Sequence, residues 1–560
     1  MNKYTTALIS TFIGLLLVLA ALVMLFTGES NLGTGEPFQI PAPDGAVLAG
    51  TYYPGSNEKL GVILLEGFGS DQVSMHSLAN DFHLSGFQVF TFDFAGQGQS
   101  SGGLTFDNAQ TDRLAKEVLA LKANIASISD VPDMQVFLVG HSLGGRVALQ
   151  SAILDPSGIK GLVLIGPQVN LESNQQAEFF TGTQDENLAW VKTLGPSIPA
   201  TNILILSGEL DDILPANSAD VLLSRLVGKP TVTNGVKYVF ETKTGFSREW
   251  LLFQAVFHNY EIYDPEVISA AVKWAQVESN IPQLSAIPVT DELRPWMWIL
   301  GMAGILLTLF GIQNWLRASM RRMKREYHGL ELKQIQPFLV RKALLWLAAV
   351  PLMLLLAGLS WLIPLDKPVF NLYYVAFIGG YGLLMLALYA LGKVPRIFTK
   401  IKIGLGKNQV SVKRLGLAVG FNIILFFVLM YYGNSGWYQI PPAGERLLWA
   451  AIFTPFTALG FWIGQLEDDL IAHALPQEKT KRTILTLIGL LPFFLYLLLM
   501  LVLGSTSGLL GGLEGLMILF IVLRQGKITY HLTGIRWLSA VLQAVLLYLL
   551  VLPGGTLFKG

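Results

Sequence analysis

Between residues 29 and 290, short apolar runs alternate with longer stretches in which apolar positions recur at helical spacing. Short apolar runs of this kind predict strands that are buried on both faces, and the periodic stretches between them predict helices. We therefore expect one α/β domain, with a mostly parallel sheet and helices on both of its faces. The predicted strands are 60–65, 87–92, 135–139, 161–165, 203–206 and 236–240.

The pattern changes beyond Pro295, where much longer apolar stretches take over. Each is long enough to cross a bilayer as a helix, which rises about 1.5 Å per residue. Residues 4–28 carry no charge and predict a further helix of this kind. The sequence thus predicts an all-α multi-span transmembrane bundle with nine spans in total. The eight spans after the α/β domain are 296–316, 343–364, 370–392, 415–433, 446–466, 483–503, 507–524 and 533–553.

Two alternatives to this count stay open. A cleaved signal peptide would also begin with an apolar segment, but the run at 4–28 is longer than usual and no clear small-x-small site follows it. We therefore favour an uncleaved anchor. In the second alternative, residues 504–515 form a re-entrant loop, which leaves eight spans and returns the C-terminus to the inside.

The composition agrees with a membrane protein, because 52% of the residues are hydrophobic and only 14% are charged. The mean hydropathy is +0.50. The formal net charge is zero, which gives no support for a nucleic-acid partner. The chain has no cysteine, which excludes disulfides, thiolate catalysis and cysteine-based zinc sites.

The charges of the loops predict the orientation of the bundle. Loops 317–342 and 393–414 are strongly basic, whereas loops 366–371, 433–446 and 504–508 carry few basic residues. Because loops rich in Lys and Arg stay in the cytoplasm, the two basic loops lie inside and the α/β domain lies outside. We therefore expect a multi-pass protein of the cell membrane, with a cytoplasmic N-terminus and an extracytoplasmic domain.

A Gly-x-Ser-x-Gly motif, Gly-His-Ser-Leu-Gly at 140–144, directly follows the predicted strand at 135–139. Small and apolar residues after the motif predict a helix. Such a strand–turn–helix arrangement exposes the oxygen of Ser142 on a strained turn, and the glycines let the strand and the helix approach each other. The free N–H groups at the start of the helix point to the same place. The alternative is a glycine-rich turn with a capping serine.

The sequence around this motif resembles the α/β-hydrolase superfamily, in particular its serine aminopeptidase and monoacylglycerol-lipase-like branch. The resemblance runs from Ile40 to Trp274. Glu-Gly-Phe-Gly-Ser at 66–70 stands where the family has the His-Gly-x-Gly loop of its oxyanion hole. The segment 93–100 is similar to the family's D-x-R-G-x-G-x-S turn, with Ala95 in place of the arginine. The resemblance implies the α/β-hydrolase fold and a serine hydrolase.

The resemblance also implies a triad in the chain order serine, acid, histidine. The segment 208–215 is similar to the family's G-x-x-D-x-x-x-P and selects Asp211, while Asp212, one position later, is the alternative. His258 is the only histidine of the domain after Asp211, which leaves it as the base. Residues 245–257 are interpreted as an insertion before it. The predicted catalytic residues are Ser142, Asp211 and His258.

Each predicted role follows from the chemistry of the side chain. The hydroxyl of Ser142 is un-ionised near neutral pH, and His258, with an ordinary pKa of about 6.5, accepts its proton and returns it to the leaving group. Asp211 orients the imidazole and stabilises its charged form. The N–H groups of Phe68 and Leu143 would hold the oxyanion, a contribution of roughly 3 kcal/mol per donor. No metal or organic cofactor is implied.

Glu66 departs from the family, which has a histidine beside the oxyanion loop. An ionised carboxylate facing an oxyanion would oppose catalysis, so Glu66 must point away, be paired or be protonated. Residues 166–200 are predicted to form a short lid. In this lid, Phe179, Phe180 and Trp190 either line an acyl pocket or pack on the sheet.

Two classes of function fit these features. The first is a membrane-bound serine hydrolase that cleaves an ester, thioester or amide through an acyl-enzyme, with a small-molecule or lipid-like acyl substrate and membrane lipids around it. The second is a transporter or sensor whose hydrolase-like domain binds a ligand without catalysis. Glu514, the most interior acid of the spans, is a relay candidate in the second class or an outer-interface residue. The predicted domains are an N-terminal transmembrane anchor at 1–28, an extracytoplasmic α/β-hydrolase domain at 29–290 with a lid at 166–200, and a membrane domain of about eight helices at 291–560.

Overall fold

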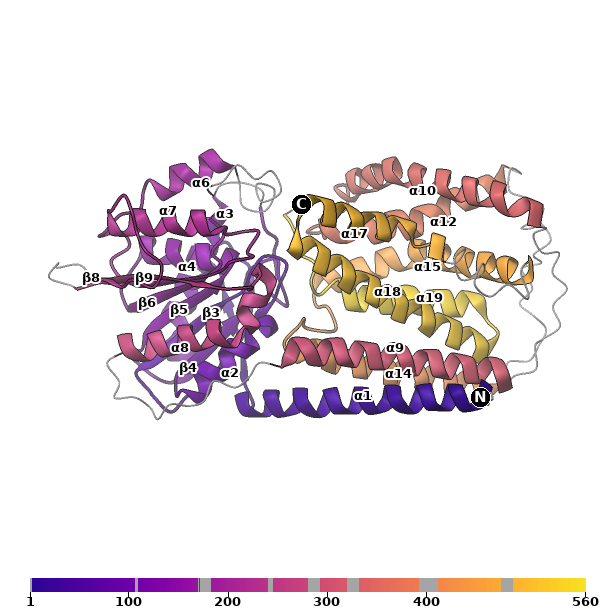
Figure 1. The fold of residues 1–560 in the computed structure, drawn as a ribbon, viewed down its shortest axis with the longest axis horizontal. Coiled ribbons are helices and arrows are strands. Elements are labelled where there is room, and N and C mark those ends of the chain that lie inside the picture. Colours follow the sequence, from indigo (N-terminus) through magenta and orange to yellow (C-terminus); the bar gives the residue numbers. More distant parts are fainter. Residues whose placement is uncertain are drawn as a thin grey trace.

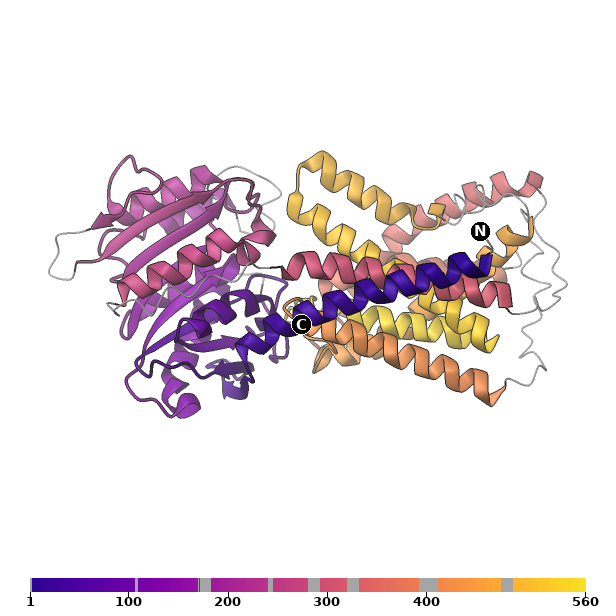
Figure 2. The same ribbon diagram turned by 60° about the horizontal axis from the view of Figure 1, so that its bottom comes forward.

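The computed structural model describes residues 3–105, 109–169, 171, 183–239, 245–279, 293–319, 332–391, 411–474 and 487–559. A domain built on a sheet and a bundle of helices lie end to end along the longest axis (Figure 1). Helices α1 and α9 run side by side along the bundle in both ribbon views (Figures 1 and 2). The chain therefore enters and leaves the α/β domain through two neighbouring helices.

Nine strands form one sheet in the order β1-β2-β4-β3-β5-β6-β7-β9-β8. From β4 to β9 neighbouring strands pair in parallel, and β1, β2 and β8 add antiparallel pairs towards the two edges. The mostly parallel sheet confirms the predicted fold class. The strands are β1 (Glu36–Pro41), β2 (Val47–Tyr53), β3 (Leu60–Leu65), β4 (Gln88–Phe92), β5 (Gln135–His141), β6 (Ile159–Ile165), β7 (Asn202–Gly208), β8 (Tyr238–Val239) and β9 (Ser247–Phe253).

Helices cover both faces of the sheet because alternate strand residues point to opposite sides. Val62 and Leu64 of β3 belong to the core under α2 and α8, whereas Ile63 and Leu65 belong to the core under α3, α4 and α7 (Figure 1). The helical segments of the domain are η1 (Gln72–Met75), α2 (His76–Leu84), α3 (Gln110–Ser129), α4 (Leu143–Leu154), α6 (Gln184–Val191), α7 (Ala216–Val227), η2 (His258–Tyr263) and α8 (Pro265–Glu278).

The last parallel strand lies where the sequence did not predict one. The predicted strand at 236–240 contributes only the two-residue edge strand β8, so its expected place in the parallel sheet is wrong. That place is taken by β9, within the segment that we interpreted as an insertion. Its sequence begins Ser-Arg-Glu, so it lacks a continuous apolar run. Arg248 is nevertheless fully buried, because its guanidinium donates to the carbonyl oxygen of Pro199 at 2.7 Å.

Among the described residues, six helices are long and apolar enough to cross a membrane, and three shorter apolar helices stand at the other predicted spans. Successive helices run in alternating directions, and the C-terminus returns to the end that faces the domain (Figures 1 and 2). The helical segments are α1 (Lys3–Leu32), α9 (Arg294–Ser319), α10 (Leu332–Ser360), η3 (Val369–Asn371), α11 (Leu372–Tyr374), the π-helical turn η4 (Val375–Gly379), α12 (Gly380–Ala390), α14 (Val412–Asn434), α15 (Glu445–Ala474), α17 (Leu491–Leu503), α18 (Thr506–Thr533) and α19 (Arg536–Val551).

Two features bear on the alternatives for the span count. Helix α18 is continuous from its first turn onward and includes Glu514, so a re-entrant loop at 504–515 does not fit. Helices α1 and α9 touch through glycines, because a Cβ added to Gly304 would lie 2.9 Å from the carbonyl oxygen of Gly14. Small residues at such contacts let helix backbones approach closely in membrane bundles. Helix α1 is therefore packed as an integral part of the bundle.

Candidate active site

Ser142 occupies the turn between β5 and α4. Its backbone has φ +54° and ψ −116°, a conformation that residues other than glycine rarely adopt. Its N–H donates to the carbonyl oxygen of Ile165 at 2.9 Å, which fixes the turn against β6. A Cβ added to Gly140 would overlap the carbonyl group of Gly144, so strand and helix meet this closely only with glycine there. This is the strained strand–turn–helix geometry that the motif predicts.

Asp211 and His258 meet at the same edge of the sheet, beyond β7 and β9. The Nδ1 of His258 lies 3.0 Å from Oδ2 of Asp211, and both side chains are buried. The other oxygen of Asp211 accepts the N–H groups of Ile213 at 2.7 Å and Leu214 at 2.9 Å. Burial alone would raise the pKa of Asp211, but the His258 charge and these hydrogen bonds outweigh it, so the pKa is lowered. Burial lowers the pKa of His258, but the charge of Asp211 and its hydrogen bond raise it by more, so the pKa of His258 is raised.

The serine turn, the histidine and the predicted oxyanion loop are in contact. The Nε2 of His141, the residue before Ser142, lies 3.1 Å from the carbonyl oxygen of His258. On the other side, a Cβ added to Gly67 would lie 3.3 Å from the Cβ of Ser142. Phe68, the next residue of that loop, is one predicted oxyanion donor. Leu143, the other, begins α4, whose first N–H groups have no partner within the helix.

Asp212 takes no part in the contact with His258. Its carboxylate instead accepts hydroxyl groups at the start of α18, from Ser505 at 3.3 Å, Thr506 at 3.1 Å and Ser507 at 2.9 Å. Acceptors at the N-terminus of a helix also meet the positive end of its dipole. The neighbouring acids thus face different parts of the molecule, one the histidine and the other the bundle.

Glu66 points away from Ser142, into the turn that follows β4. Its Oε1 accepts the N–H of Phe94 at 2.9 Å and the amide of Gln97 at 2.8 Å. Burial and the nearby carboxylates of Asp93 and Asp71 raise its pKa well above the ordinary range, which favours the neutral form. The departure from the family therefore places a hydrogen-bonded acid with a raised pKa behind the oxyanion loop.

Only part of the predicted lid can be placed, because Phe179 and Phe180 lie outside the described residues. Trp190 belongs to α6 and packs against α4. Its Nε1 donates to Gln150 at 2.9 Å, and the guanidinium of Arg146 lies 4.5 Å from the ring centroid. Trp190 thus packs on helix α4 and not on the sheet itself.

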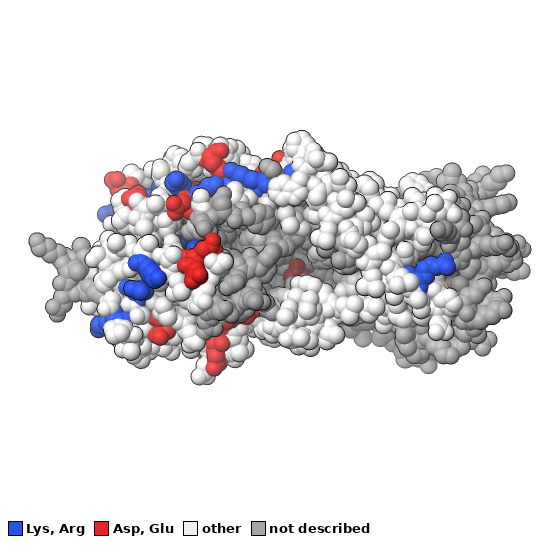
Figure 3. Space-filling view, turned by 90° about the horizontal axis from the view of Figure 1, so that it is seen from above, with Lys and Arg blue, Asp and Glu red and all other residues white. Residues whose placement is uncertain are grey.

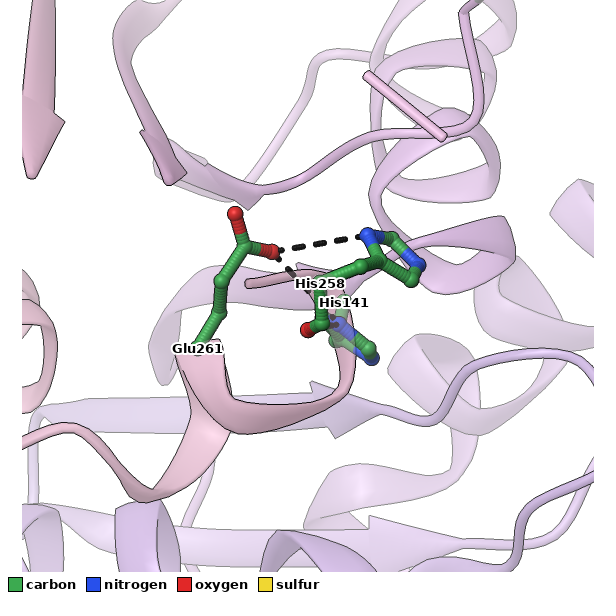
Figure 4. Close-up of side chains that lie close together, drawn as sticks. All are labelled: His141, His258 and Glu261. Atoms are coloured by element: carbon green, nitrogen blue, oxygen red, sulfur yellow. Dashed lines mark hydrogen bonds and ion pairs between the residues drawn. The ribbon is translucent and has the colours of Figure 1, made fainter. Parts of the chain in front are cut away.

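Glu261 is a third acid at this site that the sequence analysis missed. Its Oε1 accepts the N–H of Gly208 at 2.7 Å, and its Oε2 lies 3.7 Å from Nδ1 of His258 and 3.6 Å from Nε2 of His141 (Figure 4). Burial first, and Asp211 second, raise its pKa well above the ordinary range. The sequence does place Glu261 three residues after His258, a spacing that puts both side chains on one side of a helical turn. This spacing alone does not show that Glu261 is buried.

His141, His258 and Glu261 also hold ligating atoms within 4.8 Å of one another, a spacing compatible with a metal ion. The Nδ1 of His258, however, already binds Asp211. We therefore assign these groups to the histidine–acid cluster.

Fold and site together define the class of protein. The strand order, the serine turn at the end of β5 and the acid after β7 are those of α/β-hydrolases, and residues 56–214 match the family model described as "Serine aminopeptidase, S33". The domain belongs to the α/β-hydrolase superfamily.

The chain is also similar to individual proteins. The chain is 31% identical over 128 residues to the monoglyceride lipase of Mus musculus, which covers 22% of this chain and 41% of the relative. It is 25% identical over 162 residues to the monoacylglycerol lipase of Mycolicibacterium smegmatis, and this match covers 28% of this chain and 53% of the relative. The solved structure of a Paleococcus ferrophilus monoacylglycerol lipase matches with 17% identity and a TM-score of 0.33, over 41% of this chain and 99% of that one. The chain spans about half or less of the length of these curated relatives.

Proposed function

We propose that the protein is a membrane-bound serine hydrolase that cleaves an ester, thioester or amide of a lipid-like acyl substrate. The observation that carries the proposal is the strained Ser142 turn beside the bonded pair of His258 and Asp211. A turn with φ near +54° is energetically costly, and such strain concentrates at functional sites. The relatives named as monoglyceride lipases support an acyl glyceride-like substrate.

The proposed reaction proceeds through an acyl-enzyme. The Oγ of Ser142 attacks the acyl carbon while His258 takes its proton, and the carbonyl π electrons move to oxygen as an oxyanion. The N–H groups of Phe68 and Leu143 stabilise this oxyanion. Its collapse breaks the bond to the leaving group, which receives the proton from His258. Water, deprotonated by His258, then attacks the acyl-enzyme to give a second oxyanion. Its collapse breaks the bond between the acyl carbon and Oγ, which takes the proton from His258, and the acid and free Ser142 result.

The location of the site supports a substrate from the membrane. The carboxyl ends of the central strands face the bundle, because Asp212 binds α18 and the Oδ2 of Asp71 accepts the N–H of Gln439 at 2.6 Å. The hydroxyl of Tyr263 also donates to the carbonyl oxygen of Gly436 at 3.0 Å. In the proposed protein the triad therefore lies close to the surface of the bilayer.

The membrane arrangement is part of the proposal. The apolar helices and the basic loops 317–342 and 393–414 support nine spans, with the loops in the cytoplasm and the α/β domain outside. We retain the division into an anchor at 1–28, a hydrolase domain at 29–290 and a membrane domain at 291–560.

Labelling of isolated membranes by a fluorophosphonate probe tests the proposal. The wild-type protein should be labelled and should hydrolyse short acyl esters, whereas Ser142→Ala should lose both properties. Ser157→Ala, at an exposed serine in the same domain, is the matched control and should keep both. If wild-type protein that is correctly inserted neither reacts with the probe nor turns over esters, the hydrolase proposal fails and the ligand-binding alternative takes its place.

A further inference from the structure

A buried arginine of the bundle binds the turn that follows β4. Arg446, in the first turn of α15, is 1% exposed. Its two terminal nitrogens donate to the carbonyl oxygens of Gly98 at 2.8 Å and Gly96 at 2.5 Å, and its Nε donates to Gly555 at 2.9 Å. The two glycines flank Gln97 on either side. The turn is the one in which Ala95 replaces the arginine of the family motif.

Gln97 in turn holds the oxyanion loop on both sides of Phe68. Its Nε2 donates to the carbonyl oxygen of Gly67 at 3.0 Å, and its Oε1 accepts the N–H of Gly69 at 2.6 Å. The carbonyl of Gly67 and the N–H of Phe68 belong to the same peptide unit. Because that unit is planar and trans, fixing the carbonyl oxygen on one side fixes the direction of the Phe68 N–H on the other.

The C-terminal tail, residues 552–559, supports the same turn. The N–H of Leu557 donates to the carbonyl oxygen of Gly96 at 2.8 Å, and the hydroxyl of Thr556 lies 3.3 Å from Oε1 of Gln97. Phe558 is buried, and its ring centroid lies 6.1 Å from that of Phe68. The tail therefore contacts both the turn and the oxyanion loop.

We propose that Arg446 is a positioning residue for the oxyanion hole, acting through Gln97 on the Phe68 N–H with help from the C-terminal tail. The hydrolase domain then reaches full activity only while it is docked on the bundle. This inference rests on the proposed hydrolase function. It also gives the bundle a role besides anchoring, since the bundle completes the geometry of the site.

The test compares Arg446→Gln with wild type in the purified full-length protein. A badly oriented oxyanion donor reduces the stabilisation of the transition state but leaves the binding of the substrate almost unchanged. We therefore expect kcat to fall by about 10- to 100-fold with KM nearly unchanged. The inhibition constant of a trifluoromethyl ketone, whose hemiketal oxygen occupies the oxyanion hole, should rise by a similar factor. Arg446→Lys should restore part of the loss, because an ammonium group can donate to two of the three carbonyls.

Arg294→Gln is the matched control. Arg294 is a buried arginine at the same end of the bundle, but it pairs with Glu29 at 2.7 Å instead of touching the turn. Its replacement should change stability without changing kcat per folded molecule. If Arg446→Gln lowers the melting temperature to the same extent while kcat and the ketone inhibition constant keep their wild-type values, the positioning role is wrong.

Thr556→Val decides the question if Arg446→Gln does not fold. The substitution keeps the shape of the side chain and removes only the hydroxyl near Gln97. We expect kcat to fall by roughly 3-fold at constant KM, as for the loss of one weak hydrogen bond. An unchanged kcat would overturn the proposal. Failure of the hydrolase proposal itself is recognised separately, because then the wild-type protein shows no turnover at all.

Discussion

The α/β domain and the helical bundle both bury apolar side chains, but they expose different kinds of side chain. The domain carries Lys, Arg, Asp and Glu over its surface, whereas the described face of the bundle is almost free of charge (Figure 3). Polar side chains lie inside the bundle instead. The amide of Gln465 donates to Gln543 at 2.6 Å and Ser539 at 2.9 Å, and that of Asn422 donates to Thr529 at 3.0 Å.

The difference is the one expected if the domain lies in water and the bundle, as proposed, lies in a bilayer. In water, the free energy of folding comes mainly from removing apolar surface, so a domain there hides its Val, Leu and Phe. In hydrocarbon, apolar side chains gain nothing by being buried, while polar groups need partners inside the bundle. Helix α17 is the extreme case, since it is apolar throughout and none of its residues is buried.

The largest expected effect separates the two neighbouring acids. Asp211→Asn should lower kcat by about 10⁴-fold, because the amide favours the wrong tautomer of His258. Asp212→Asn should change kcat only mildly, because Asp212 contacts the hydroxyl groups of α18. Steady-state hydrolysis of a short acyl ester measures both. The reverse ranking would move the acid by one position.

The second prediction compares an exposed apolar residue of the bundle with one of the α/β domain. Ile424 of α14 is 66% exposed and Val277 of α8 is 64% exposed. Ile424→Asp places a charge at the middle of a proposed span and should cost about 3 kcal/mol in insertion or stability. Val277→Asp faces water and should change stability by less than about 0.5 kcal/mol. Thermal unfolding in nanodiscs measures both values, and equal losses would contradict the two-solvent interpretation.

Topology can be tested by labelling, because the chain has no cysteine of its own. Ser127→Cys, exposed on the domain, should react with an impermeant maleimide in cells without an outer barrier. Ser411→Cys, at the end of a basic loop, should react about tenfold less until the membrane is permeabilised, since Lys- and Arg-rich loops stay in the cytoplasm. Protection of Ser127→Cys together with labelling of Ser411→Cys would reverse the proposed orientation.

The smallest expected effect concerns Glu261. Activity requires neutral His258, so it should fall as the pH drops through the raised pKa of that histidine. The pKa of Glu261 is raised, which favours its neutral form. Because glutamine is also neutral, Glu261→Gln should leave kcat within about 3-fold of wild type. The pH–rate profile is the measurement. A shift of its acid limb to lower pH would mean that Glu261 is ionised and raises the pKa of His258.

Local sequence was sufficient for features that depend on neighbouring residues. The apolar runs located five of the parallel strands, and the glycine pattern at 140–144 located the turn that only small residues permit. Long uncharged stretches likewise located the apolar helices. The strand β9 was missed because Arg248 breaks its apolar pattern, and its burial depends on carbonyl groups from another segment.

Only the tertiary structure shows the contacts between residues that lie far apart in the chain. The sequence by itself predicted the fold class of the domain from its alternating apolar runs, and its resemblance to the α/β-hydrolases indicated Ser142, Asp211 and His258. It gave no sign that Glu261 joins the histidine, because burial depends on the packed core. It also gave no sign that Arg446 donates to the carbonyl oxygen of Gly96, which lies 350 residues away in the sequence. Such contacts arise only when the bundle and the domain dock, and no periodicity or local propensity records a partner at that distance.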